Sequence, residues 1–309
     1  MNDVLGRTGT ILGLLGLSLV TAPLQAGEDP PTETPPSRAE ILERWNPAIV
    51  RVEALVETKF NMGGQAQEQE ARLDLNGALV DNRGLVMIWN SHISSNRMTE
   101  MMREMGRGET FGIEMRPSEF EVVTEEGEEI PAFLAATDSP LDLAFLQLKR
   151  QPETPVEPVR FADSATPAIG DEVLGIQRLG ESFDFAPYLG TARIGGELKK
   201  PRRAWILDGD LGGLGLPVFD RRGRPVGALM TILSRAGEDA PLQNMGFGNM
   251  MGMMGGQGTF GPFGIFVLPG SRVASLVSLA RDRADQLLEE MEAEEGEGRG
   301  PEGEDPPAG

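Results

Sequence analysis

The stretch GDLGGLGLPVFDRRGRPVGAL, residues 209–229, carries the features that decide the fold. A glycine-rich turn leads to Pro217 and a short apolar strand, and a charged turn around Gly223 precedes a second apolar strand. Hydrolases place nucleophiles in such turns, because the backbone N–H groups of the turn can stabilise a developing oxyanion. This turn has leucine where a serine would be expected. The stretch therefore indicates a β-protein with a nucleophile-type turn that lacks the nucleophile.

The composition sets limits on the function. The chain has 309 residues, of which 39% are hydrophobic, and this is enough for one large or two modest domains. The 40 Gly and 23 Pro residues favour short strands joined by turns. The absence of Cys excludes disulfides, thiolate metal sites and a Cys nucleophile. A net charge of −20 argues against nucleic acid as a partner, because phosphates would be repelled.

The N-terminus is typical of a signal peptide. Arg7 precedes an apolar run over residues 10–20, and Ala26 supplies the small residue that suits signal-peptidase cleavage. The run is much shorter than the roughly 20 apolar residues of a membrane-spanning helix, and no other stretch could span a bilayer. We therefore expect an exported protein, periplasmic or secreted, with a retained N-terminal anchor as the alternative.

Strand patterns cover most of the chain, which predicts an all-β fold of two antiparallel β-barrels. Two helices flank them: residues 36–44, capped by Ser37 with Glu40, and an amphipathic helix over 271–295, capped by Ser271. Strands are predicted at 48–57, 71–89 (a hairpin), 120–138 (a hairpin), 141–149, 172–178, 187–195, 203–208, 216–220, 225–233 and 263–268. The expected organisation is signal peptide 1–26, linker 27–39, first barrel 40–150, second barrel 151–272, helix 273–293 and disordered acidic tail 294–309.

Three features at strand ends follow the order of a chymotrypsin-type triad. His92, the only histidine of the chain, follows a strand; Asp142 opens a buried strand; the glycine-rich turn comes third. In such a triad the imidazole takes the proton, the carboxylate holds the imidazole, and the turn presents a nucleophile beside the oxyanion donors.

Residues 45–285 resemble a trypsin-like serine peptidase of the HtrA/DegP type. The resemblance implies two barrels in the chymotrypsin arrangement, with His92 and Asp142 at the catalytic His and Asp positions. It leaves no segment for the PDZ domain that such proteases usually carry. The segments that resemble the family are NGALVDNRGLVMIWNSHI, GEEIPAFLAATDSPLDLAFLQL, FADSATPAIGDEVLGIQRLG, LGTARIGG and FGIFVLPGSRVASLV.

The nucleophile turn departs from the family pattern Gly-X-Ser-Gly-Gly-Pro. When Pro217 is aligned with the proline of the pattern, Gly212 and Gly215 match. Leu214 then takes the serine position, and Leu216 replaces the second glycine. This is the register that we prefer.

A second register matches Gly209, Gly212 and Gly213 and puts Leu211 at the serine position, with an insertion before the proline. Neither register supplies a hydroxyl, because residues 192–230 contain no Ser or Thr. Leucine has no ionisable proton and no lone pair, so covalent catalysis is unavailable. Gly212, Gly213 and Gly215 remain as an oxyanion-type turn.

Without a nucleophile, His92 and Asp142 are interpreted as a remnant dyad rather than a working acid–base pair. The segment before the histidine carries one extra residue between Gly84 and His92, which affects where the imidazole lies. A displaced nucleophile is the other option. The candidates, which lie on the first-barrel side and lack an oxyanion turn, are Ser91, Ser94 and Ser95.

Two Met-rich segments, 96–108 and 245–264, interrupt the strand pattern. The first has helical spacing, with Gly106 as its end, and is interpreted as an adaptable packing face near His92 or a partner. Thioether sulfurs also suit Cu(I), so copper binding is an alternative. The methionines concerned are Met98, Met101, Met102, Met105, Met245, Met250, Met251, Met253 and Met254.

The sequence therefore predicts an exported, catalytically inactive protease homologue that binds a peptide or protein in its cleft or on a barrel edge. No cofactor and no metal is expected, and homo-oligomerisation is left open. The alternatives are a serine endopeptidase with residual activity or an unrecognised nucleophile, and a Met-rich copper-binding protein on the same scaffold.

Overall fold

In a computed structural model of the protein, the described residues are 34–62, 65–96, 99–100, 111–200, 202–231 and 265–297. The contacts separate a unit that ends at Thr34 from a unit that begins at Pro35, and the fold below is that of the second unit. The predicted signal peptide, most of the linker, the tail beyond Glu297 and nearly all of both Met-rich segments lie outside the described residues.

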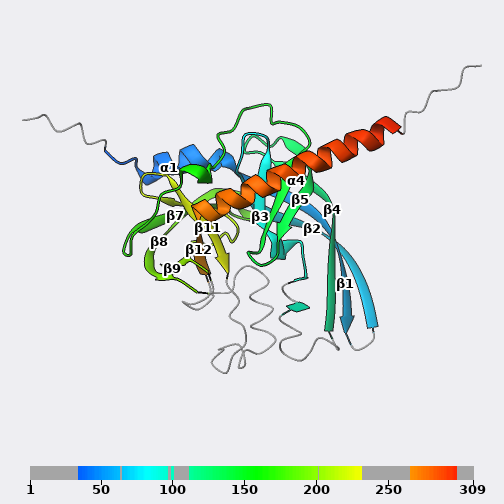
Figure 1. Ribbon diagram of the computed structural model, residues 1–309, viewed down its shortest axis with the longest axis horizontal. Helices are drawn as coiled ribbons and strands as arrows, with labels where there is room; N and C mark the ends of the chain where they lie inside the picture. Colours follow the sequence, from blue (N-terminus) through cyan, green and yellow to red (C-terminus); the bar gives the residue numbers. More distant parts are fainter. Residues whose placement is uncertain are drawn as a thin grey trace, which may run out of the picture. The chain divides into compact units, whose positions relative to one another are not determined.

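The first barrel is closed by six antiparallel strands in the order β1-β2-β3-β6-β5-β4 (Figure 1). Its interior is filled by branched aliphatic side chains such as Val52, Val86, Ile88 and Leu146, each fully buried. The strands are β1 Ile49–Met62, β2 Gln65–Leu79, β3 Leu85–Trp89, β4 Phe111–Val123, β5 Glu129–Asp138 and β6 Leu143–Leu148.

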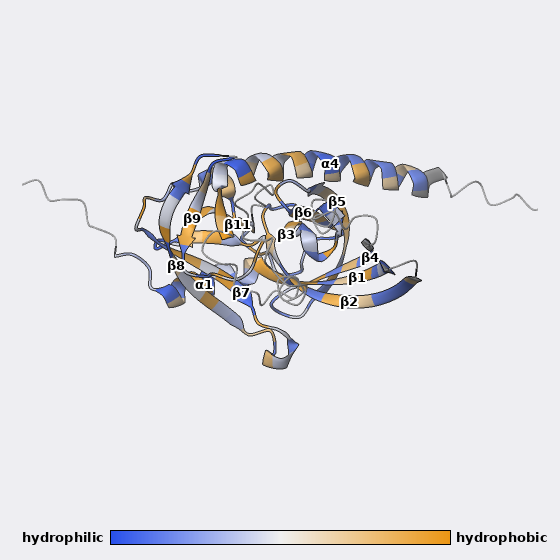
Figure 2. Cartoon of the chain, turned by 90° about the horizontal axis from the view of Figure 1, so that it is seen from below, coloured by the Kyte–Doolittle hydropathy of each residue, from blue (hydrophilic) through white to orange (hydrophobic). Residues whose placement is uncertain are grey.

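Three of these strands are longer than the sequence predicted. The strand expected at 48–57 continues to Met62, and its two partners, expected from 71 and 120, begin at Gln65 and Phe111. These ends pair only with one another, β1 lying between β2 and β4 (Figure 1). Figure 2 shows the far part of β2 as hydrophilic, so its side chains give no alternation of apolar and polar residues.

The second barrel is closed by six antiparallel strands in the order β10-β11-β12-β9-β8-β7. The glycine-rich stretch that precedes β10 lies at one end of this barrel. The strands are β7 Glu172–Arg178, β8 Pro187–Leu198, β9 Ala204–Asp208, β10 Pro217–Asp220, β11 Pro225–Thr231 and β12 Ile265–Pro269. The predicted fold class, two antiparallel β-barrels followed by a helix, is confirmed.

Helix α1, Arg38–Trp45, packs on the second barrel although it precedes the first. Its start is the predicted capping box, in which Ser37 and Glu40 satisfy each other's backbone N–H groups. Trp45 at its end is buried, stacks on Phe219 with ring centroids 5.2 Å apart and donates from Nε1 to the carbonyl of Gly223 at 2.7 Å.

Helix α4, Gly270–Glu297, lies along both barrels and is banded with apolar and charged residues (Figures 1 and 2). The helix begins at Gly270, so the expected cap, Ser271, lies in the first turn instead. Arg281 on this helix pairs with Asp81 in the β2–β3 turn at 2.8 Å. Among the described residues, no helix has the length and hydropathy to cross a membrane.

The Arg281–Asp81 pair allows a test of how α4 is held. Asp81 is buried, so Arg281→Met leaves its carboxylate with the backbone N–H groups of Arg83 and Leu85 but without this cation, and we expect a loss of about 2 kcal/mol in the free energy of unfolding. Arg283→Met is the matched control on the same helix, because Arg283 contacts the exposed Glu290. Its expected loss is below about 0.5 kcal/mol. Urea denaturation measures both, and equal losses would contradict this account.

Candidate active site

The three features expected to form a triad come from three separate connections. His92 ends a short 3₁₀ turn, η2 Asn90–His92, directly after β3. Asp142 lies in the turn between β5 and β6. The glycine-rich turn precedes β10 in the second barrel. The site therefore has residues from both barrels.

Asp142 is fixed by hydrogen bonds at both ends. It is 1% exposed, and its backbone has a φ of 59°, which is rare for a residue other than glycine. Its carbonyl accepts from the Asn90 N–H at 3.0 Å. Its carboxylate accepts from Trp89 Nε1 at 2.5 Å and from the Ser91 hydroxyl, whose Oγ lies 2.8 and 2.7 Å from the two oxygens.

His92 is placed differently from the histidine of a triad. Its buried Nδ1, the atom that holds the carboxylate in a triad, has no hydrogen-bond partner in the described part of the chain. Its ring instead meets the edge of Trp89, with centroids 4.7 Å apart. Burial lowers the pKa of His92 to about 4, and the charge of Asp142 only partly opposes this. The imidazole is therefore neutral at pH 7.

Ser91, one residue before His92, makes the hydrogen bond to the carboxylate of Asp142 that a triad histidine would make. The extra residue that the sequence was expected to carry between Gly84 and His92 is in line with this difference of one position. Sequence reasoning considered Ser91 only as a nucleophile. The signal that could have identified its contact was this same extra residue.

The glycine-rich turn approaches the first barrel at Gly215. This residue is buried with a φ of 81°, and a Cβ added to it would lie 2.6 Å from the backbone nitrogen of Trp89. No side chain fits in that space. The neighbouring Gly212, with a φ of 61°, lies against the side chain of Gln177 in β7, 2.6 Å from its Nε2 by the same measure. Glycine is thus required at position 215, where the obstacle is backbone, and favoured by its positive φ at position 212.

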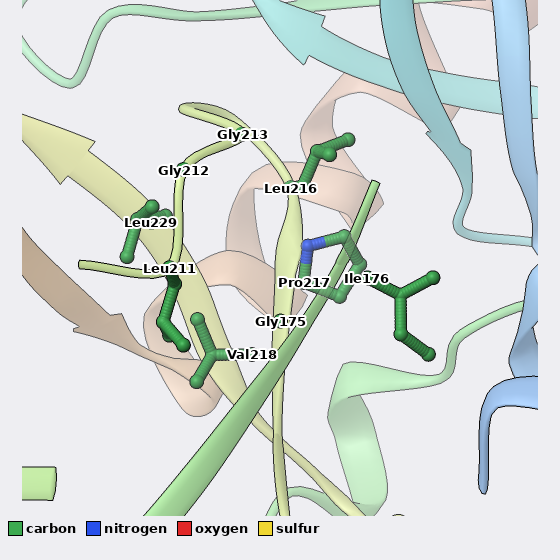
Figure 3. A pocket seen from close by; sticks show the side chains of 9 residues that line it. All are labelled: Gly175, Ile176, Leu211, Gly212, Gly213, Leu216, Pro217, Val218 and Leu229. Atoms are coloured by element: carbon green, nitrogen blue, oxygen red, sulfur yellow. The ribbon is translucent and has the colours of Figure 1, made fainter. Parts of the chain in front are cut away.

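The leucines of the turn differ in burial. Leu211 is 2% exposed and packs inside the second barrel with Val218 and Leu229, whereas Leu214 is only partly buried. Leu216 is also 2% exposed, and Figure 3 shows it pointing to the opposite side of the turn from Leu211. A side chain at position 211 is therefore enclosed by the barrel, and one at position 214 lies partly at the surface.

Two N–H groups of the turn already donate hydrogen bonds within the protein. The Gly212 N–H donates to the carboxylate of Asp210 at 2.8 Å. The Gly215 N–H donates to the Leu229 carbonyl at 2.8 Å, and the Leu229 N–H donates to Leu216 at 2.9 Å. Gly215 and Leu216 thus both bond to Leu229, so the pairing of β10 with β11 extends irregularly, with two residues opposite one, to Gly215.

No group of three or more His, Cys, Asp or Glu side chains suited to a metal occurs in the described ranges. The methionines proposed as copper ligands lie outside these ranges.

Comparison with known protein families gives one match. The family model of the trypsin-like peptidase domain matches residues 76–227. This range contains His92, Asp142 and the whole glycine-rich turn. A search of curated proteins finds no match.

The burial of His92 predicts a dependence of stability on pH. The unfolded chain binds a proton as the pH falls through 6.5, and the folded chain does so only near 4. Stability is therefore lost as the pH falls through this window, by up to about 2 kcal/mol between pH 7 and pH 5. Urea denaturation at both pH values should show a smaller loss for His92→Asn. An identical loss in this variant would contradict the prediction.

The unequal burial of Leu211 and Leu214 can be tested with two identical substitutions. Leu211→Ala leaves a cavity in the second barrel, with an expected loss of about 3 kcal/mol in unfolding free energy. Leu214→Ala removes a partly exposed side chain, with an expected loss below about 1 kcal/mol. Thermal or urea unfolding measures both, and a greater loss for Leu214→Ala would show that position 214 faces the core.

Proposed function

Since the chain carries a domain of the trypsin-like peptidase family, we propose that it is an exported, HtrA-type protease homologue that no longer cleaves peptides. We propose further that it acts by binding a peptide or protein. The observation that carries the proposal is the bonding of Asp142. Its carboxylate accepts from Ser91 and Trp89, and Nδ1 of the single histidine is left without this contact.

Loss of this contact removes the role of the dyad. In a serine protease the carboxylate fixes the tautomer of the histidine and stabilises the imidazolium that forms when the histidine takes the proton. His92 lies in an environment that disfavours the imidazolium, as its lowered pKa of about 4 indicates. A serine hydroxyl at the carboxylate is a poor proton acceptor, so Ser91 does not replace the imidazole as a base.

The turn lacks the nucleophile as well. The partial exposure of Leu214 supports the first register, with Leu214 at the serine position. Leu211, inside the second barrel, is out of reach of any substrate. In an unrelated serine protease, loss of the serine alone lowers kcat about 10⁶-fold.

The oxyanion donors are altered in the same register. Trypsin-like proteases use the N–H of the first glycine of the motif and that of the serine. The first of these positions corresponds to Gly212, whose N–H already donates to Asp210. An aspartate carboxylate at this point competes with, and repels, a developing oxyanion. The turn therefore keeps the glycines of a protease turn, but the Asp210 carboxylate disfavours binding of an oxyanion there.

Export and binding rest on different observations. The signal-peptide pattern of residues 1–26 supports export, and the resemblance of residues 45–285 supports the HtrA type. Binding follows from what a protease fold keeps when it loses hydrolysis: a surface between two barrels and exposed strand edges that can pair with an extended chain. The tail and the net charge of −20 favour a partner that is not acidic.

The test is reaction with a fluorophosphonate probe, together with casein hydrolysis. We expect neither in the wild type or in Leu214→Ser, because this variant gains a hydroxyl but no imidazole on Asp142. The variant Leu214→Ser/Ser91→His supplies both groups and is the matched comparison. A probe-labelled serine in the wild type would overturn the proposal. Activity of Leu214→Ser alone would show that His92 still serves as the base.

A further inference from the structure

The β7–β8 hairpin exposes three large apolar side chains. Leu179, Phe183 and Tyr188, the only tyrosine of the chain, are 38%, 65% and 47% exposed, and together they are called the hairpin patch. The register pairs Gln177 with Tyr188, and the Leu179 N–H donates to Ala186. Leu179 and Tyr188 therefore lie on the face of the hairpin that carries Gln177, because alternate residues of a strand share a face.

The tip of the hairpin is ordered by its own hydrogen bonds. A 3₁₀ turn, η4 Glu181–Phe183, forms the tip. The N–H of Phe183 donates to Gly180 at 2.9 Å, and the N–H of Ala186 donates to Phe183 at 3.1 Å. The exposure of Phe183 is thus a property of a structured turn. An apolar side chain held in this way loses little conformational entropy when a partner covers it.

The turn is held in a strained backbone conformation. Asp184 and Phe185 both have positive φ, 52° and 49°, which residues other than glycine rarely adopt. Phe185 is held against the first barrel, where the Arg51 guanidinium lies 4.3 Å from its ring centroid. Its carbonyl also accepts from Arg178 at 3.5 Å. Contacts with Arg51 and Arg178 therefore hold Phe185 against the protein, whereas Phe183 remains exposed to solvent.

The hairpin patch adjoins the glycine-rich turn. Gln177, on the face of Leu179 and Tyr188, contacts Gly212. A Cβ on Gly190 would lie 3.6 Å from the Tyr188 ring and 3.3 Å from the Leu211 carbonyl, so strand β8 also borders the turn. The patch and the partly exposed Leu214 thus belong to neighbouring elements.

The exposed charges beside Phe183 are acidic, whereas the nearby Arg178 is only partly exposed and bonds to backbone carbonyls. Glu181 and Asp184 flank Phe183 and are exposed, and Asp210 is exposed on the turn. A second copy of the chain docking through the same patch would bring these carboxylates together, which like-charge repulsion disfavours. A segment with basic residues beside an apolar anchor matches both the charge and the apolar surface.

We infer that the hairpin patch is the docking surface for a protein segment in which large apolar residues are flanked by Lys or Arg. The inference rests on the proposed binding function and names its surface and the chemistry of the partner. Leu179, Phe183 and Tyr188 supply the apolar contact, and aromatic side chains of this kind dominate the affinity of many interfaces. Glu181 and Asp184 select the basic flanks.

The experiment measures the anisotropy of a labelled probe peptide with a Phe-Leu-Phe centre between two pairs of lysines. We expect the wild type to bind it, and Phe183→Ser/Tyr188→Ser to bind it at least about tenfold more weakly. The matched control, Ile169→Ser/Leu279→Ser, removes two apolar side chains that are at least as exposed as Phe183 and Tyr188 (71% and 65%). This variant should bind the peptide as the wild type does. A peptide with glutamates in place of the lysines should not bind.

The outcomes separate this inference from the proposed function. Equal binding of the lysine peptide by both double variants overturns the docking role of the hairpin patch. Failure of the wild type to bind this peptide does the same. If the fluorophosphonate probe does not label the wild type, the proposal of an inactive homologue still stands in both cases. A dimer in sedimentation velocity that Phe183→Ser/Tyr188→Ser dissociates makes a second copy the occupant and also overturns the inference. Labelling of the wild type by the fluorophosphonate probe overturns the proposed function, whatever the peptide does.

Discussion

The backbone of Gly215 lies so close to that of Trp89 that no side chain fits between the glycine-rich turn and strand β3. This contact joins the two barrels at the point where a trypsin-like protease has its active site. It explains the glycine at position 215 without reference to catalysis, since both the positive φ and the lack of space demand it. The glycines are thus explained by packing and cannot be taken as a sign of catalysis.

The same distinction applies to Asp142. A buried carboxylate needs hydrogen-bond donors, because leaving one uncompensated costs several kcal/mol. Trp89 and Ser91 supply donors here, and Asn90 fixes the backbone in its unusual conformation. An aspartate of this kind is retained for stability even when no imidazole depends on it. His92, with a buried Nδ1 and a lowered pKa, belongs to the packing around Trp89.

Sequence patterns predicted the barrels well, because their interiors are built from alternating aliphatic residues, and the capping box of α1 has a local signature at Ser37 and Glu40. The extended end of β2 was missed because its exposed, polar side chains carry no burial pattern, and the ends of β1 and β4, which pair with it or with each other, were missed too although Ile113 and Met115 alternate with exposed residues. The partner of Asp142 was missed for a different reason. A shift of one residue exchanges Ser91 for His92 at the carboxylate, and such a shift depends on the exact path of the chain after β3.

The proposed loss of hydrolysis changes what the surface near the turn can do. A protease must release its products, so tight binding beside its nucleophile slows turnover, whereas a binding protein has no such limit. Strain at Asp184 and Phe185 that leaves Phe183 in solvent costs stability and contributes nothing to the core. Such a cost is sustained where an exposed side chain has a use. The contact between Phe185 and Arg51 holds the tip of the β7–β8 hairpin, and this hairpin borders the glycine-rich turn, so the turn and the hairpin patch lie on neighbouring elements.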